Sequence, residues 1–127
     1  MGTIKHISVI SIPVSDPERA KVFYADTLGF AVLADSEFAP GRRWVQLAPE
    51  GAQTSITLTT WLDDLPPGSV RGNILEVVDL AVARAEFEAR GLVFTGPDDE
   101  TPWGTFAPFA DPDGNRWSLG TYAGAAA

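Results

Sequence analysis

The hydrophobic positions of residues 4–29 change from a two-residue repeat to a helical one. Residues 4–14 alternate in the way a β-strand does. Asp16 and Pro17 then supply a helix cap and a favoured first helical residue, and Gly29 is suited to end the helix. Between them the apolar residues fall on one helical stripe, namely Ala20, Phe23, Tyr24 and Leu28. The pattern predicts a strand followed by a helix that packs on a sheet.

Three further strands are predicted between residues 30 and 61. The segments 30–36, 43–48 and 54–61 are separated by turns that contain Pro and Gly. Alternation within them separates an aliphatic face from a face that is polar and aromatic. The three segments are therefore expected to form a meander.

The second half of the chain repeats this order. Residues 63–69 contain paired Asp, paired Pro and a Gly, which is typical of a linker. A strand over 71–78 precedes a helix with Asp79 as its cap and Gly91 as its end; a strand over 92–95, a turn-rich loop over 96–102 and a hairpin follow. The pattern predicts one α+β domain over 1–127, made of two βαβββ modules over about 1–62 and 70–122. The residues from Tyr122 onward are expected to be frayed.

The sequence Asp111-Pro112-Asp113-Gly114-Asn115 is the strongest turn signal in the chain. Pro112 presets φ for a tight turn, and Gly114 can take a positive φ without strain. The outgoing strand has a core face with Trp117 and Leu119 and a second face with Arg116, Ser118 and Gly120. Because Pro108 has no N–H to donate, the incoming strand is expected at a sheet edge or with a bulge.

Charge and composition exclude several classes of function. The net charge of −8 argues against nucleic acids and anionic membranes as partners. It favours a cationic ligand, although solubility alone also explains it. The chain has no Cys and a single His, His6, so thiolate chemistry and sites with two imidazoles from one chain are excluded. With no membrane-length apolar run and no signal-peptide pattern, a cytoplasmic location is expected.

Three segments together resemble the vicinal oxygen chelate superfamily of glyoxalases, bleomycin-resistance proteins and extradiol dioxygenases. They are VSDPERAKVFYADTLGF, VVDLAVARAEFEARGLVF and WGTFAPFADPDGNRW, in that order. The resemblance implies paired βαβββ modules whose sheets curve into a cup, with the ligand inside and a homodimer as the assembly. In metal-dependent members the ligand positions correspond here to Val9, Thr57, Gly72 or Asn73, and Ser118. None of these residues is His or Glu, so we expect no metal and no cofactor. Metal-dependent glyoxalase, dioxygenase or thiol-transferase activity is therefore not expected either.

Strand alternation predicts which side chains line the cup. The lining consists of Ile7, Val9, Ser11, Trp44, Gln46, Ser55, Thr57, Thr59, Trp61, Ile74, Glu76, Arg116 and Ser118, with Trp103 at the mouth. Trp44 and Trp61 serve equally well as packing, as dimer contacts or as ligand platforms. Glu76 and Arg116 form an ion pair or contact a ligand.

Three functions follow from this lining. The preferred one is a metal-free protein that resembles bleomycin-resistance proteins and sequesters a small aromatic compound, with a cationic one favoured by the net charge. Its predicted contacts are Trp44, Gln46, Thr57, Trp61, Glu76, Trp103, Arg116 and Ser118. The alternative is a cofactor-free isomerase or lyase with Glu76 as base and with Arg116 and Ser118 holding an oxyanion. The third is an interaction module whose cup is filled by its own side chains.

Overall fold

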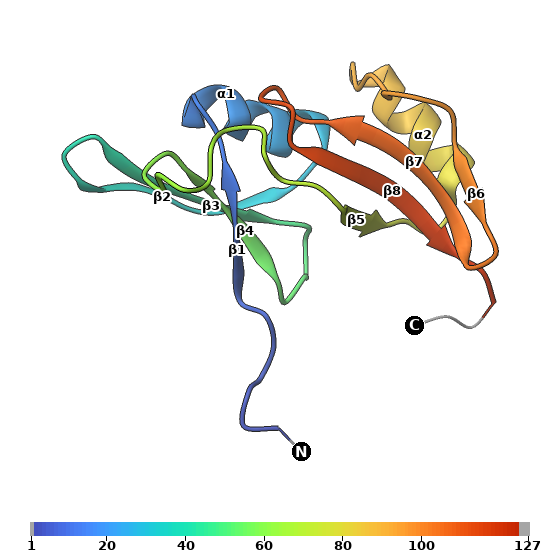
Figure 1. Cartoon of the computed structure of the whole chain (residues 1–127), viewed down its shortest axis with the longest axis horizontal. Helices are drawn as coiled ribbons and strands as arrows, with labels where there is room; N and C mark the ends of the chain where they lie inside the picture. The colour runs from blue at the N-terminus through green and yellow to red at the C-terminus, as the bar shows by residue number, and fades with distance from the viewer. Residues whose placement is uncertain (1, 125–127) are drawn as a thin grey trace. The chain divides into compact units, whose positions relative to one another are not determined.

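The computed structural model of the chain describes residues 2–124 (Figure 1). These residues divide into two compact units, one that ends at Pro67 and one that begins at Gly68, named here unit 1 and unit 2. No helix in this part of the chain is long and apolar enough to cross a bilayer.

Unit 1 contains one helical segment and a four-stranded mixed sheet. Its elements are β1 (Val9–Pro13), α1 (Pro17–Val22), the π-helical turn η1 (Phe23–Thr27), β2 (Ala31–Ala39), β3 (Arg42–Ala48) and β4 (Ser55–Thr59). The sheet order is β1-β4-β3-β2, in which β1 and β4 are parallel and the other neighbours antiparallel.

Unit 2 has the same topology. Its elements are β5 (Asn73–Glu76), α2 (Leu80–Ala89), β6 (Asp99–Thr101), β7 (Gly104–Ala110) and β8 (Arg116–Tyr122). The order β5-β8-β7-β6 repeats that of unit 1, again with one parallel pair, β5 and β8. The predicted α+β fold with tandem βαβββ modules is confirmed. Asp16 and Asp79 cap the two helices, as predicted.

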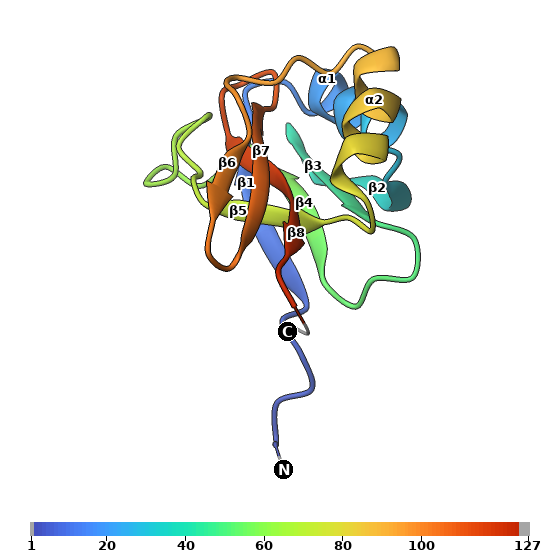
Figure 2. The same ribbon diagram turned by 90° about the vertical axis from the view of Figure 1, so that its right-hand side faces the viewer.

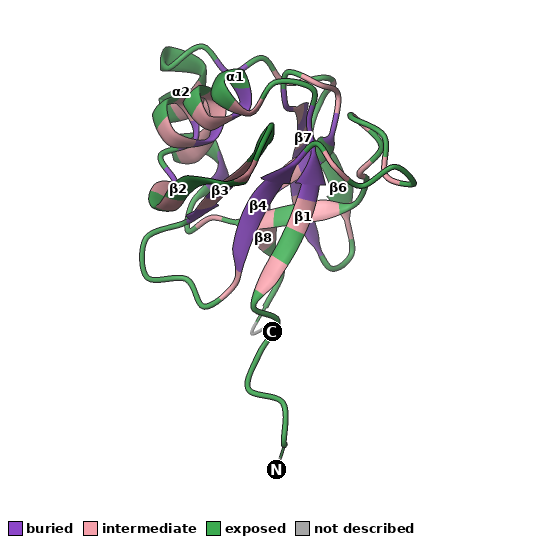
Figure 3. Ribbon diagram, turned by 90° about the vertical axis from the view of Figure 1, so that its left-hand side faces the viewer, coloured by how far each residue is buried: buried purple, intermediate pink, exposed green. Residues whose placement is uncertain are grey.

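Each helix covers one face of its own sheet and leaves the other for side chains of mixed character. In unit 1, α1 contacts β3 and β4, and Val45, Leu47 and Leu58 are fully buried. In unit 2, α2 contacts β7 and β8 (Figure 2), and Phe109 and Leu119 are buried. β4 is buried along its whole length (Figure 3), so both of its faces are covered.

The turn between β7 and β8 is built as the sequence predicts. Asp111 Oδ1 accepts hydrogen bonds from the backbone N–H groups of Asp113 at 3.0 Å and Asn115 at 2.9 Å. Gly114 has φ 96°, a conformation that favours glycine. The fully buried Asn115 donates to Asp111 Oδ2 at 2.8 Å and accepts from the N–H of Val70 at 3.1 Å. The turn therefore holds the segment before β5 beside β8.

Several predicted strand boundaries are wrong. β1 begins at Val9 rather than at residue 4, and residues 92–95 contribute only a bridge between Phe94 and Phe109. The expected loop over 96–102 instead contains β6. Tyr122 lies in β8 rather than in a frayed tail, and residues 125–127 of that predicted tail lie outside the described part of the chain.

The expectation that Pro108 lies at a sheet edge or a bulge is also wrong, because β7 pairs with both β6 and β8 without a register shift. Pro108 is tolerated because β6 is short and ends its pairing at Phe106. The carbonyl of Pro108 faces that side and accepts from Thr95 N–H at 2.9 Å. Its ring nitrogen faces the same side, since N–H and C=O of one residue share a direction in an antiparallel strand, so no hydrogen bond to β8 is lost.

Four charged side chains tie α1 to the hairpin of β2 and β3. Arg43 donates to Asp35 through Nε at 2.8 Å and Nη2 at 2.7 Å and also contacts Glu18, while Lys21 contacts Asp35 at 2.7 Å. Hydrogen bonds from Arg43 and then from Lys21 hold the pKa of Asp35 well below its usual range. The charged form of Asp35 is therefore favoured by folding.

Replacing Asp35 by Asn should lower the free energy of unfolding at pH 7 by about 1 kcal/mol, the upper range for part-exposed ion pairs. Because the pKa of Asp35 is lower in the folded chain, its charge stabilises the fold at pH values above the unfolded-state pKa of about 3.9. This stabilisation is lost as the pH falls below that value. Urea unfolding should show that the free energy of unfolding of Asp35→Asn differs more from that of wild type at pH 7 than at pH 3. Glu37→Gln, an exposed change on the same strand, is the control; an equal difference at both pH values would contradict the assignment.

Candidate functional site

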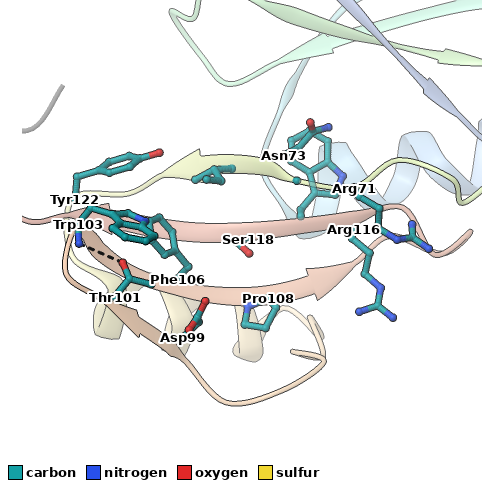
Figure 4. A pocket seen from close by; sticks show the side chains of 13 residues that line it. Arg71, Asn73, Asp99, Thr101, Trp103, Phe106, Pro108, Arg116, Ser118 and Tyr122 are labelled. Carbon is teal, nitrogen blue, oxygen red and sulfur yellow. Dashed lines mark hydrogen bonds between the residues drawn. The ribbon is translucent and has the colours of Figure 1, made fainter.

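Unit 2 contains a pocket of about 420 Å³ on its sheet (Figure 4). Cross-strand register places Ile74, Ser118 and Pro108 side by side, so that they share one face of β5, β8 and β7. All three line the pocket, whereas Leu119, the next residue along β8, is buried and points to the opposite face. The pocket therefore lies on the sheet face away from α2.

Aromatic side chains form one end of the pocket. The rings of Phe106 and Tyr122 meet edge to face at 5.6 Å, and Trp103 lies beside them (Figure 4). A Cβ atom at Gly120 would collide with the ring of Phe106. Glycine at this position therefore lets Phe106 lie flat across β8 and form the pocket floor.

The turn between β6 and β7 presents Trp103. Thr101 Oγ1 donates to the carbonyl of Gly104 at 2.8 Å and accepts from the N–H groups of Trp103 at 3.3 Å and Gly104 at 3.1 Å. Trp103 remains 64% exposed. A rigid turn that carries an exposed indole supplies a stacking surface for a flat ligand.

Two arginines lie at the other end of the pocket (Figure 4). Arg71 Nη1 donates to the carbonyls of Gly68, Val70 and Gly114 at 2.7, 2.8 and 3.3 Å, which makes it a structural clamp on the turn. The guanidinium of Arg116 has no hydrogen bond or ion pair with any residue of 2–124. Within residues 2–124, the whole guanidinium of Arg116 is therefore available to a ligand, whereas Nη1 of Arg71 is engaged.

Glu76 does not meet Arg116, so the ion pair considered from the sequence does not form. Both residues lie on the predicted face, but Glu76 is level with Gly120 on β8, and Arg116 lies four residues earlier. Four residues of strand span about 13 Å, beyond the reach of an ion pair. Glu76 is exposed and does not line the pocket, whereas Trp103, Arg116 and Ser118 do.

Unit 1 carries the other predicted ligand contacts. Trp44 and Trp61 stack with ring centroids 6.2 Å apart and planes at 28°, and Phe38 packs edge-on against both. The indole N–H of Trp44 donates to Gln46 Oε1 at 3.0 Å, and Gln46 Nε2 donates to Ser55 Oγ at 2.8 Å. Strand alternation therefore placed Trp44, Gln46 and Ser55 correctly on one face, where they form an aromatic and polar surface held by hydrogen bonds.

Comparison with known proteins identifies the family. The sequence profile described as Glyoxalase/Bleomycin resistance protein/Dioxygenase superfamily matches residues 3–119. The chain belongs to this superfamily.

Two solved structures from Streptomyces sp. CB03234 are similar to this superfamily member. One is described as TnmS3, an antibiotic binding protein; it is 45% identical, the match covers 97% of this chain and 100% of that one, and the TM-score is 0.88. The second, described as a glyoxalase/bleomycin resistance protein, is 46% identical with 90% and 98% covered and a TM-score of 0.78. The uncharacterized protein YetH of Bacillus subtilis (strain 168) is 29% identical over 91% of this chain and 98% of its own length.

The residues at the superfamily's metal positions do not fit a metal ion. Val9 and Gly72 offer no side-chain donor, the alternative Asn73 offers only a neutral amide, and Thr57 and Ser118 offer only neutral hydroxyls. Thr57 is 1% exposed, and its Oγ1 has no hydrogen-bond partner in the described part of the chain. His6, exposed before β1, is not placed to compensate, and within residues 2–124 no three His, Cys, Asp or Glu side chains form a metal-binding group.

Sequence reasoning missed several residues of these two surfaces. Phe38 lies beyond residue 36, where the sequence predicts the end of the strand, but β2 continues to Ala39. Phe106 was not assigned to a face, although its pairing with Gly120 follows from the hairpin register. Asp99 lies in a segment read as a loop, and nothing in its local pattern marks the three-residue strand β6.

Proposed function

We propose that this chain is a metal-free binding protein that sequesters a small aromatic compound. The observation that carries the proposal is the pocket of unit 2, which combines an aromatic end at Trp103, Phe106 and Tyr122 with a few polar groups. Such a lining suits a flat, partly polar organic ligand. The similarity to TnmS3, which is described as an antibiotic binding protein, supports the proposal.

Two sequence hypotheses are less well supported. The isomerase or lyase hypothesis requires Glu76 as base beside Arg116 and Ser118, but Glu76 lies outside the pocket. The interaction module requires a cavity filled by its own side chains, whereas the pocket of unit 2 leaves about 420 Å³ open. A homodimer stays a prediction from the family resemblance, and the outer strands β1 and β5 are unpaired on one edge within their own sheets, as strands available for an interface are.

Isothermal titration with anthracene-2-carboxamide, with cyclohexanecarboxamide as a non-aromatic control, tests the proposed function. We expect saturable binding of the aromatic probe alone, unchanged after dialysis against EDTA, because no described residue set provides a metal site. Mass spectrometry should recover the probe unmodified. A loss of binding in EDTA, or conversion of the probe, would contradict a metal-free binding role.

A further inference from the structure

The pocket of unit 2 is polarised along β8. Arg116, Ser118, Gly120 and Tyr122 follow one another on the same strand face, and Phe106 crosses at Gly120. The row thus runs from the guanidinium of Arg116 through the hydroxyl of Ser118 to aromatic rings that meet edge to face. From Arg116 to Gly120 the strand rises about 13 Å, so a ligand that contacts both ends has to be elongated.

The charge of the pocket differs from the charge of the chain. Arg71 is bound to three backbone carbonyls, and Arg116 is the second cation of the lining. The carboxylate of Asp99 is the acidic group of the lining, and it lies level with Phe106, at the aromatic end. At physiological salt the rest of the net charge of −8 is screened beyond about 8 Å. Among the side chains that line the pocket, the two cations therefore lie at one end and the acidic group lies at the aromatic end.

We infer that the ligand is an elongated aromatic compound with an anionic substituent, bound with its rings at Trp103 and Phe106 and its anion at Arg116. This inference rests on the proposed function and specifies the ligand class. It replaces the cationic ligand that the net charge favours. Asp99 fixes the orientation, because an anion at the aromatic end would meet a like charge there. Ser118, between the two ends, is placed to hydrogen-bond a polar group near the middle of the ligand.

The experiment compares two probes of nearly equal shape, anthracene-2-carboxylate and anthracene-2-carboxamide. Wild type is expected to bind the acid about ten- to a hundredfold more tightly than the amide, as a charge-assisted hydrogen bond provides. Arg116→Gln should abolish that preference by weakening acid binding while amide binding is retained. Arg42→Gln makes the same change of charge at an exposed arginine of unit 1 and should leave both affinities unchanged.

A second variant tests the orientation. Asp99→Asn removes the like charge from the aromatic end, and it should let the acid bind in either direction and so weaken its dependence on Arg116. Circular dichroism and thermal unfolding establish that each variant is folded. Equal affinity of wild type for acid and amide, or unchanged acid binding in Arg116→Gln, would overturn the anionic ligand and leave aromatic binding intact. Failure of both probes to bind wild type would overturn the proposed function as well.

Discussion

Asp111→Ala is expected to lower the free energy of unfolding by about 3–5 kcal/mol. The Asp111 carboxylate accepts from the N–H groups of Asp113 and Asn115 and from the side-chain amide of Asn115, and it is 5% exposed. Each buried donor left without an acceptor costs about 1–3 kcal/mol. Urea unfolding followed by Trp fluorescence measures the change.

A matched substitution separates this effect from the loss of a charge. Asp64→Ala removes an exposed carboxylate from the connecting segment, and its stability should stay within about 0.5 kcal/mol of wild type. Asp111→Ala should also weaken binding of the aromatic acid, because the turn holds Val70 against Asn115 and Arg116. A stability of Asp111→Ala close to that of Asp64→Ala would show that the turn is held by other contacts.

Trp103→Ala is expected to weaken binding of anthracene-2-carboxamide by about ten- to a few hundredfold, as the loss of a central interface Trp does. The indole is exposed and its turn is fixed through the hydroxyl of Thr101, so truncation should change stability little. Isothermal titration measures the affinity. Val93→Ala, which removes exposed apolar surface elsewhere in unit 2, is the control. An affinity unchanged in Trp103→Ala would place the ligand away from this pocket.

The same titration examines the aromatic surface of unit 1. Trp44 and Trp61 stay predicted ligand contacts from the sequence, so Trp61→Ala is expected to lower the affinity for a probe that binds on the aromatic surface of unit 1, where a stacked aromatic pair adds about 0.5–1.5 kcal/mol beyond the area it buries. Reduced stability with unchanged affinity would instead make the contacts among Phe38, Trp44 and Trp61 a matter of packing.

Local rules in the sequence were sufficient for the architecture of each unit. The capping residues Asp16 and Asp79 act through atoms within three positions of themselves, so they can be recognised without a fold. The turn at Asp111–Asn115 is equally local. Two-residue alternation placed Trp44, Gln46 and Ser55 on one face, and hydrogen bonds now join them. The residue types at Val9, Thr57 and Ser118 are the basis for expecting no metal site, and this stays a prediction.

Tertiary structure decided the register between strands, that is, which residues of neighbouring strands lie opposite each other. Alternation gives the face of a strand but not its register, so Glu76 and Arg116 share a face and still lie four residues apart along β8. The strand β6 and the interior position of Pro108 depend on pairing with β7, which is non-local. The aromatic end of the pocket likewise exists because Gly120 on β8 leaves room for Phe106 on β7. The sequence determined the elements and their faces because those depend on near neighbours. Strand register, and the lack of a partner for the Arg116 guanidinium among residues 2–124, depend on contacts between segments that only the folded chain brings together.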